Sequence, residues 1–203
     1  MIAWEIIPKQ KHGASTDAVS KIKLDTIDEA LWEFEIVKDR LLDVSHWHQL
    51  SADIEAKFQL MDGDGNELYR RVREGDYLRI NIPGPGNGDG EGYGWVKIEQ
   101  IEFTDNEAES FEYVAMNVRP CPSPLNNEPA TAHFFKDIAT STFMVNRKYN
   151  VISAEVHRRN EITNTDSQSI SSQIRNFVVG IGAILGLSKV QWKSLVDGLV
   201  KLD

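Results

Sequence analysis

The stretch that decides the fold is Ile54-Glu-Ala-Lys-Phe-Gln-Leu60, in which apolar and polar side chains alternate strictly. A period of two places the apolar side chains on one face of an extended strand, so this stretch predicts a strand with one buried and one solvated face. The same alternation returns in residues 78–82 and 114–118. Several strands of this kind, separated by turn residues, indicate an antiparallel sheet.

Two further features support the sheet. Residues 96–98 and 101–103 alternate in the same way, but their phase shifts by one residue near Glu99 and Gln100, which is typical of a β-bulge. Residues 142–147 and 151–157 predict a closing hairpin around Lys148-Tyr-Asn150. The segment between these regions, residues 119–129, contains four prolines and is expected to be irregular.

Helices are predicted on both sides of the strands in the chain. Thr26 and Glu29 have the spacing of a capping box, and they open a helix to about Leu42. Its apolar face is formed by Ala30, Leu31, Phe34, Val37 and Leu41.

The C-terminal part of the chain predicts two more helices. Residues 166–186 carry a broad apolar stripe at helical spacing. Ser188 and Gln191 then form a second capping box, which opens a last helix. The apolar side of that helix consists of Trp192, Leu195, Val196 and Leu199.

The sequence therefore predicts an α+β fold, in which a curved antiparallel sheet packs on a long C-terminal helix and an extra terminal helix follows. We expect a single domain over residues 1–203. Residues 1–24 are an N-terminal extension, in which a polar loop at 9–20 is followed by a second extended piece that Val19, Ile22 and Leu24 begin. Residues 25–187 are the sheet-and-helix core, and residues 188–203 are the terminal helix.

Composition limits the partners and the compartment. The formal net charge is −9, from 31 acidic and 22 basic residues, which disfavours nucleic acids and anionic membranes as partners. The single cysteine, Cys121, has no internal disulfide partner, and residues 1–8 do not resemble a signal peptide. The longest apolar run, residues 177–187, is shorter than the roughly 20 residues of a membrane span. We expect a cytoplasmic protein.

Two short motifs suggest ions but favour plainer interpretations. Asp62-Gly-Asp-Gly-Asn66 imitates the start of a calcium loop, yet Glu67 stands at its sixth position and Arg73 at its twelfth, where glycine and glutamate are needed. A hairpin turn is the preferred interpretation. His46 and His48 lie two residues apart without a third ligand at a recognised spacing, so a short helix or turn is preferred. No metal site and no cofactor are predicted.

No catalytic residues are assigned. Glu155 and His157 share the outward face of their predicted strand with Ser153, which is the arrangement of an acid–base pair or of a solvated strand face. Cys121 lies between two prolines with no histidine nearby. The glycine-rich residues 84–94 precede a strand rather than a helix, so they favour a mobile lid over a phosphate-binding loop.

The order of elements resembles the helix-grip fold of the START-like, or SRPBCC, superfamily. Leu31-Trp32, Asp43 and Trp47 look like the spaced tryptophan and aspartate pattern of many such proteins. The resemblance covers about residues 25–187 and implies an apolar cavity between sheet and helix. The residues that we expect to contact a ligand there are Trp47, Tyr93, Trp95, Met116 and Phe177.

Three functions follow, in order of preference. The first is a non-catalytic protein that binds a small hydrophobic ligand in the cavity. The second is a protein–protein interaction or assembly component, because the apolar side of the last helix needs a surface to cover it, in this chain, a partner or a second copy. The third is a cyclase- or hydrolase-like enzyme that uses residues such as His46, His48, Glu155 or His157.

Overall fold

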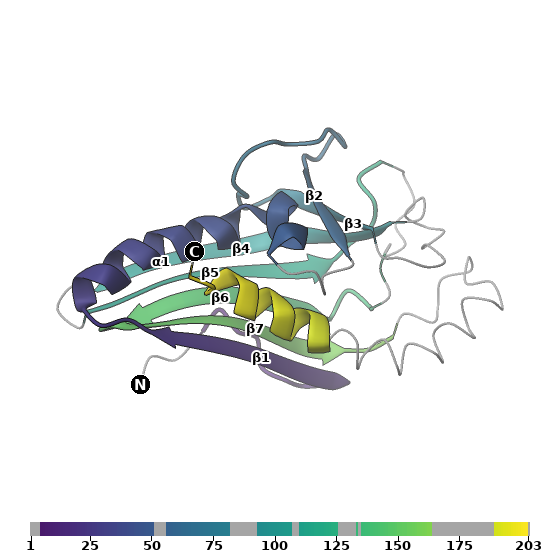
Figure 1. The fold of residues 1–203 in the computed structure, drawn as a ribbon. Coiled ribbons are helices and arrows are strands. Elements are labelled where there is room, and N and C mark those ends of the chain that lie inside the picture. The colour runs from purple at the N-terminus through teal and green to yellow at the C-terminus, as the bar shows by residue number, and fades with distance from the viewer. Residues whose placement is uncertain are drawn as a thin grey trace.

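The computed structural model describes residues 5–50, 56–81, 93–106, 110–125, 133, 135–163 and 189–202. Its centre is a seven-stranded sheet of order β1-β7-β6-β5-β4-β3-β2, with all neighbouring strands antiparallel. The elements are β1 Ala14–Lys23, α1 Ile27–Leu42, η1 Val44–Gln49, β2 Lys57–Met61, β3 Tyr77–Asn81, β4 Gly94–Asn106, β5 Phe111–Pro120, β6 Thr140–Lys148, β7 Val151–Glu161 and an unlabelled helix, residues 189–199. The α+β class with a curved antiparallel sheet is confirmed (Figure 1).

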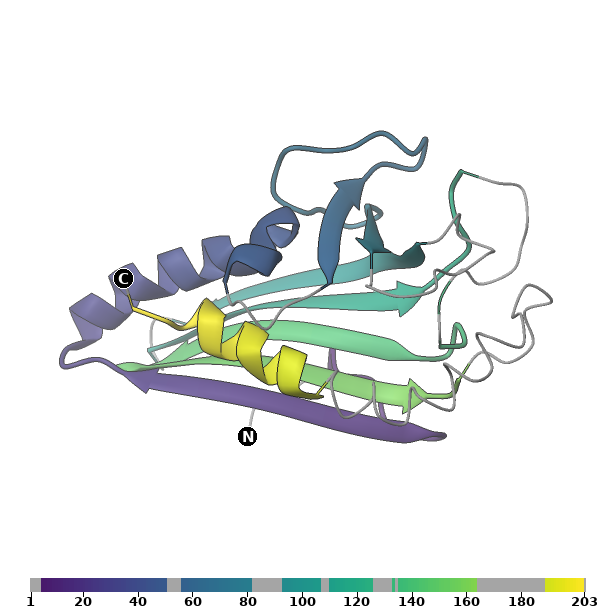
Figure 2. The ribbon, with the colours of Figure 1, turned by 45° about the vertical axis from the view of Figure 1, so that its right-hand side comes forward.

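All helices of the described chain lie on one side of the sheet. Figures 1 and 2 show α1 and the helix 189–199 side by side over the concave face of the strands, with η1 next to β2. Their buried side chains join the inward side chains of β2 to β7 in one apolar cluster, which includes Phe34, Trp47, Phe58, Met116 and Phe143. This cluster is the main core, and the polar residues of each strand alternate outward.

The N-terminal segment is where the expectation was wrong. Residues 14–23 form the edge strand β1, paired along its length with β7, although residues 9–20 were expected to form a polar loop. Of the ten residues of β1, only Ala18 is buried. An edge strand with so little burial has no clear hydrophobic alternation, so its pairing with a strand 140 residues away is decided by tertiary structure.

Elsewhere, the elements that local sequence patterns predicted are present in the structure. The hydroxyl of Thr26 accepts a hydrogen bond from the Glu29 N–H, and the Glu29 carboxylate accepts one from the Thr26 N–H, which confirms the capping box of α1. Leu31 is an exception, because it is 42% exposed and lies beside the buried face rather than on it. The bulge in β4 is confirmed by the register shift between Ile98 and Gln100, and the β6–β7 hairpin is confirmed as well.

The two C-terminal helices have different outcomes. The long helix expected at residues 166–186 lies outside the described residues, and so does Phe177. The last helix is confirmed, and its Leu195, Val196 and Leu199 are buried in the main apolar cluster. The protein's own sheet therefore covers the apolar side of the last helix, which had suggested an interaction surface.

A close approach between this helix and the end of η1 yields a first prediction. A Cβ atom added at Gly198 would lie 2.6 Å from the carbonyl oxygen of Leu50. Alanine normally stabilises a helix by about 1 kcal/mol relative to glycine. Here the alanine Cβ would clash with a backbone atom of Leu50, which cannot move aside by a change of side-chain rotamer. We expect Gly198→Ala to lower the free energy of unfolding by about 1–3 kcal/mol, measured by urea denaturation.

The matched control is Val190→Ala, a change in the same helix at a side chain that is 58% exposed. It should shift the free energy of unfolding by no more than about 0.5 kcal/mol. A Gly198→Ala variant as stable as the parent would show that the helix does not pack against Leu50 as described.

Candidate functional site

The candidate site is a charged pair at one end of the concave face. Along β7, Ile152, Ala154 and Val156 point into the main core, and Arg158 continues the same alternation two residues later. Arg158 is only 5% exposed. Arginine is rarely buried to this extent unless it is paired, so a guanidinium at the end of an apolar face calls for an explanation.

A β-bulge brings a carboxylate to the same face. Ala14 pairs with Glu161 and Thr16 with Arg158, so two steps along β1 match three along β7. The extra residue lies before Asn160, whose φ of 57° is in the left-handed region that asparagine tolerates. Residues three apart in a regular strand point to opposite faces, but here Glu161, 6% exposed, forms an ion pair with Arg158.

Two aromatic rings flank the guanidinium. The Cζ atom of Arg158 lies 5.3 Å from the ring centroid of Phe135 and 5.6 Å from that of Trp192, which are cation–π distances. Trp192 contacts Phe143 with ring centroids 5.4 Å apart, and Phe143 contacts Trp47 at 4.8 Å. The charged pair thus stands at the end of a continuous aromatic cluster that runs under the helix 189–199.

His133 adds a neutral imidazole to the site. As a whole residue it is partly buried, but its ring is enclosed, and burial followed by the positive charge of Arg158 lowers the pKa of His133 to about 4. Its Nδ1 atom accepts a hydrogen bond of 3.1 Å from the Phe135 N–H, so the proton of the neutral ring is on Nε2. At neutral pH the charges of Arg158, Glu161 and His133 therefore sum to zero.

Within the described part of the chain, the buried polar atoms at the site that have no hydrogen-bond partner include Oε2 of Glu161, an acceptor, and Nε1 of Trp192, a donor. An unsatisfied buried polar group costs about 1–3 kcal/mol, and such groups are uncommon in native proteins.

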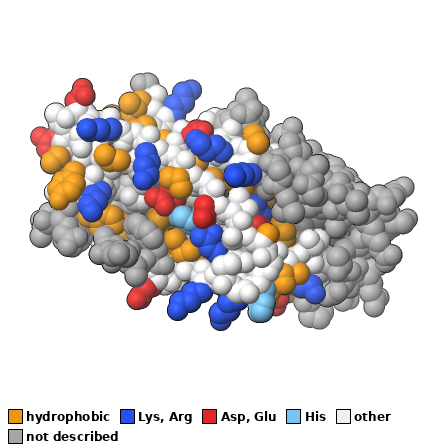
Figure 3. All heavy atoms as spheres, turned by 90° about the horizontal axis from the view of Figure 1, so that it is seen from below, with side chains coloured by type: hydrophobic (Ala, Val, Ile, Leu, Met, Phe, Trp, Pro, Cys, Tyr) orange, Lys and Arg blue, Asp and Glu red, His pale blue; other side chains and the backbone are white. Residues whose placement is uncertain are grey.

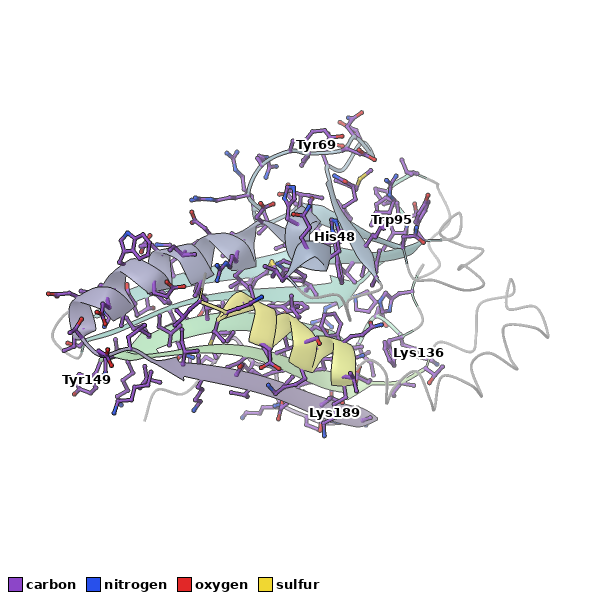
Figure 4. All side chains as sticks on the ribbon, viewed as in Figure 1. His48, Tyr69, Trp95, Lys136, Tyr149 and Lys189 are labelled. Atoms are coloured by element: carbon purple, nitrogen blue, oxygen red, sulfur yellow. The ribbon has the colours of Figure 1, made fainter. Side chains whose placement is uncertain are left out.

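Figure 4 shows Lys136 and Lys189 at this end of the molecule, and Tyr149 at the opposite end.

The sheet separates the residues that the sequence suggested as ligand contacts. Trp47 and Met116 are fully buried in the main core on the concave side. Trp95 forms a separate cluster with Met61, against which Tyr93 packs, while the neighbouring Val96 belongs to the main core. Adjacent strand residues point to opposite faces, so Trp95 and Tyr93 lie on the convex side. Phe177 lies outside the described residues.

Four residues of the site were not predicted from the sequence: Arg158, Glu161, His133 and Phe135. Arg158 had a detectable signal, because it shares the inward parity of Ile152, Ala154 and Val156. The bulge that turns Glu161 inward, and the fold that brings His133 and Phe135 to β7, leave no comparable local signal.

A second polar cluster lies on the convex face. His157 bridges two carboxylates: its Nδ1 is 2.9 Å from Oδ1 of Asp17 in β1, and its Nε2 is 2.9 Å from Oε2 of Glu155. Ser153 and Asn146 each donate a 3.0 Å hydrogen bond to the other oxygen of Glu155. Glu155, His157 and Ser153 therefore share a face as expected, within a network of satisfied hydrogen bonds. Figure 3, the view from below, shows acidic and basic side chains interspersed on the described surface.

This network predicts a pH dependence of stability. Burial lowers the pKa of His157, but hydrogen bonds to Glu155 and Asp17 outweigh it, so its pKa lies above the usual value. A raised folded pKa means that folding favours the imidazolium. The stabilisation is complete below about pH 6.5, the unfolded pKa, and is lost as pH rises through the folded pKa.

The free energy of unfolding of the parent minus that of His157→Gln, measured in urea between pH 6 and pH 9, is therefore expected to fall with rising pH. This difference isolates His157, because the pKa shifts of His133 and Cys121 are common to both proteins. The control His46→Gln changes an exposed histidine that forms an ion pair with Asp43, and the same difference for this variant should stay constant. A parent-minus-variant difference for His157→Gln that stays constant over this pH range would contradict the assignment.

The remaining motifs have structural roles where they are described. Asp62 accepts hydrogen bonds at one carboxylate oxygen from the N–H groups of Asp64 and Asn66, so it stabilises its own turn, as preferred. His46 and His48 lie on the short helix η1, as preferred. Burial raises the pKa of Cys121 to about 12, which keeps the thiol protonated and weakly nucleophilic. Residues 82–92, most of the expected glycine lid, lie outside the described residues.

Comparisons with known proteins give fold likeness only. No protein-family model matches this chain, and no curated protein sequence matches it. Solved structures that resemble it include hypothetical protein jhp0584 from Helicobacter pylori, with 13% identity, a TM-score of 0.46, and coverage of 91% of this chain and 86% of that one. Among the helices that are described, none has the length and apolar character needed to cross a membrane.

Two others bear on the expected resemblance. Truncated norcoclaurine synthase from Thalictrum flavum has 10% identity and a TM-score of 0.37, with coverage of 97% of this chain and 100% of that one. A START superfamily protein from Mycobacterium smegmatis has 10% identity and a TM-score of 0.36, with coverage of 92% and 99%. Likeness at these identities and TM-scores assigns neither a family nor an activity to this chain.

Proposed function

We propose that this protein binds a small, mainly apolar molecule between the concave face of the sheet and the helices that cover it. The observation that carries the proposal is the Arg158–Glu161 ion pair, buried at the end of an otherwise apolar face and flanked by Phe135 and Trp192. Apolar surroundings with a few convergent polar groups are typical of small-molecule sites, where the polar groups orient the ligand.

The electrostatics also support binding rather than simple structural pairing. Burying two opposite charges usually contributes little net stability, because the loss of hydration offsets their attraction. An apolar pair at positions 158 and 161 would serve a purely structural core at least as well. We therefore assign the charged pair to ligand recognition. The single cysteine fits a reducing compartment, and we infer a cytoplasmic location.

The proposal is tested with the neutral fluorescent probe N-phenylnaphthylamine, whose emission rises in apolar surroundings, and with thermal stabilisation by a panel of neutral lipids and aromatic molecules. We expect saturable probe binding and a higher melting temperature with at least one class. Ser141 lies directly across from Arg158 on β6, so Ser141→Phe should obstruct the site and weaken probe binding about tenfold or more.

Ser15→Phe is the matched control, because it adds the same ring at an exposed position of β1. It should leave probe binding unchanged. Absence of binding by the probe and by the whole panel would contradict the proposed function, and so would equal binding by the Ser141→Phe variant and the parent.

A further inference from the structure

The two unpartnered atoms at the site have complementary hydrogen-bonding roles. Oε2 of Glu161 accepts and Nε1–H of Trp192 donates, and both atoms are buried. Both side chains also contact the same group: Glu161 is the ion-pair partner of Arg158, and the Trp192 ring lies over its guanidinium. An acceptor and a donor are thus left open on two side chains that contact the same guanidinium.

We infer that the ligand carries a neutral group that both donates and accepts hydrogen bonds, a hydroxyl or an amide, and that this group binds between Glu161 and Trp192. The inference rests on the proposed function and specifies the chemistry of its ligand. Such a group donates its proton to the carboxylate and accepts the indole N–H, so it satisfies both buried atoms at once.

The charges of the site exclude ionised alternatives. Arg158 and Glu161 already neutralise each other, and His133 is neutral. A carboxylate or phosphate on the ligand would be brought close to Glu161, and an ammonium group close to Arg158, in surroundings that do not screen the repulsion. A ketone or an ether accepts only, so it would leave Oε2 of Glu161 without a donor, although Arg158 and Thr16 interact with the same carboxylate.

The test compares three probes of nearly equal size: naphthol, methylnaphthalene and naphthoate. Methylnaphthalene is the more apolar molecule, so a site without polar recognition would prefer it to naphthol. We expect the opposite order, with naphthol binding about tenfold or more tightly than methylnaphthalene, since a hydrogen bond to a charged group exceeds the value of the methyl group. Naphthoate should bind more weakly than both. Dissociation constants are measured by displacement of N-phenylnaphthylamine.

Trp192→Phe identifies the position of the polar contact. It keeps an aromatic ring over Arg158 but removes the indole N–H, so the ratio of the methylnaphthalene dissociation constant to the naphthol dissociation constant should fall severalfold below its parent value. The hydrogen bond to the Glu161 carboxylate sustains the remaining preference. The readout is this ratio within one variant, so a general loss of affinity or stability does not affect it. Thr140→Val is the control, because it removes another buried, unpartnered polar atom on the opposite face of the sheet, and it should keep the parent ratio.

The outcomes distinguish a failure of this inference from a failure of the proposed function. If methylnaphthalene binds as well as naphthol, the unpartnered atoms are satisfied by water and the inference is wrong, while the proposed function stands. Tighter binding of naphthoate than of naphthol, or a naphthol preference that is undiminished in Trp192→Phe, also overturns the inference alone. If no probe binds the parent protein, both proposals are wrong.

Discussion

Replacing Arg158 by methionine is expected to lower the free energy of unfolding of the unliganded protein by about 3–5 kcal/mol. The change leaves the Glu161 carboxylate buried without its counter-ion, and desolvation of an unpaired charge is among the largest penalties that one substitution can cause. The variant also lacks the cation–π contacts that the Arg158 guanidinium makes with the Phe135 and Trp192 rings. Urea denaturation at pH 7 measures the effect.

The double variant Arg158→Met, Glu161→Met separates charge from packing. It removes both charges, so it should be more stable than the single variant and close to the parent. Arg159→Met is the neighbouring control. It removes an ion pair with Asp17 on the convex side, where Asp17 is about half exposed, and it should cost no more than about 1 kcal/mol. A double variant as unstable as Arg158→Met would show that packing, not charge, dominates.

Trp47→Ala should lower the free energy of unfolding by about 3–5 kcal/mol, since it removes a large aromatic side chain from a fully buried position. The Trp47 ring packs edge-on against Phe58, with centroids 5.3 Å apart, and close to Phe143. Its indole N–H also donates to the carbonyl oxygens of Leu41 and Arg40, each at 3.1 Å. The substitution therefore weakens the sheet, η1 and the end of α1 together.

Trp32→Ala is the matched control for this prediction. The residue type and the substitution are the same, but the Trp32 side chain is 70% exposed on α1. Its effect should stay within about 0.5 kcal/mol. Equal losses in the two variants, measured by thermal and urea unfolding, would contradict the placement of Trp47 at the centre of the core.

The candidate site depends on a small departure from regular strand geometry. If residues 158–161 formed a regular strand without the bulge, Glu161 would point to the opposite face from Arg158 and the ion pair would not form. Asn160 is anchored in turn, because its Oδ1 accepts hydrogen bonds from the N–H groups of Lys11 and His12. The N-terminal segment thus helps to hold the bulge, and the bulge directs the carboxylate to the site.

Elements with a strong local signal were predictable from the sequence. The capping box at Thr26, the alternation in β2 to β7, the bulge near Gln100 and the amphipathic last helix are all present in the structure. Each of these signals acts within a few residues, through backbone hydrogen bonds or through the period of two or 3.6 that separates buried from exposed side chains.

By itself, the sequence determined an α+β chain with an antiparallel sheet, an N-capped first helix and an apolar C-terminal helix face. Tertiary structure decided that residues 14–23 close the sheet beside β7, that Trp95 and Trp47 lie on opposite faces, and that His133, Phe135 and Trp192 gather around Arg158. Local periodicity states how a residue faces relative to its neighbours in the chain. Which distant residue it meets depends on strand order and register, which only the packed chain sets.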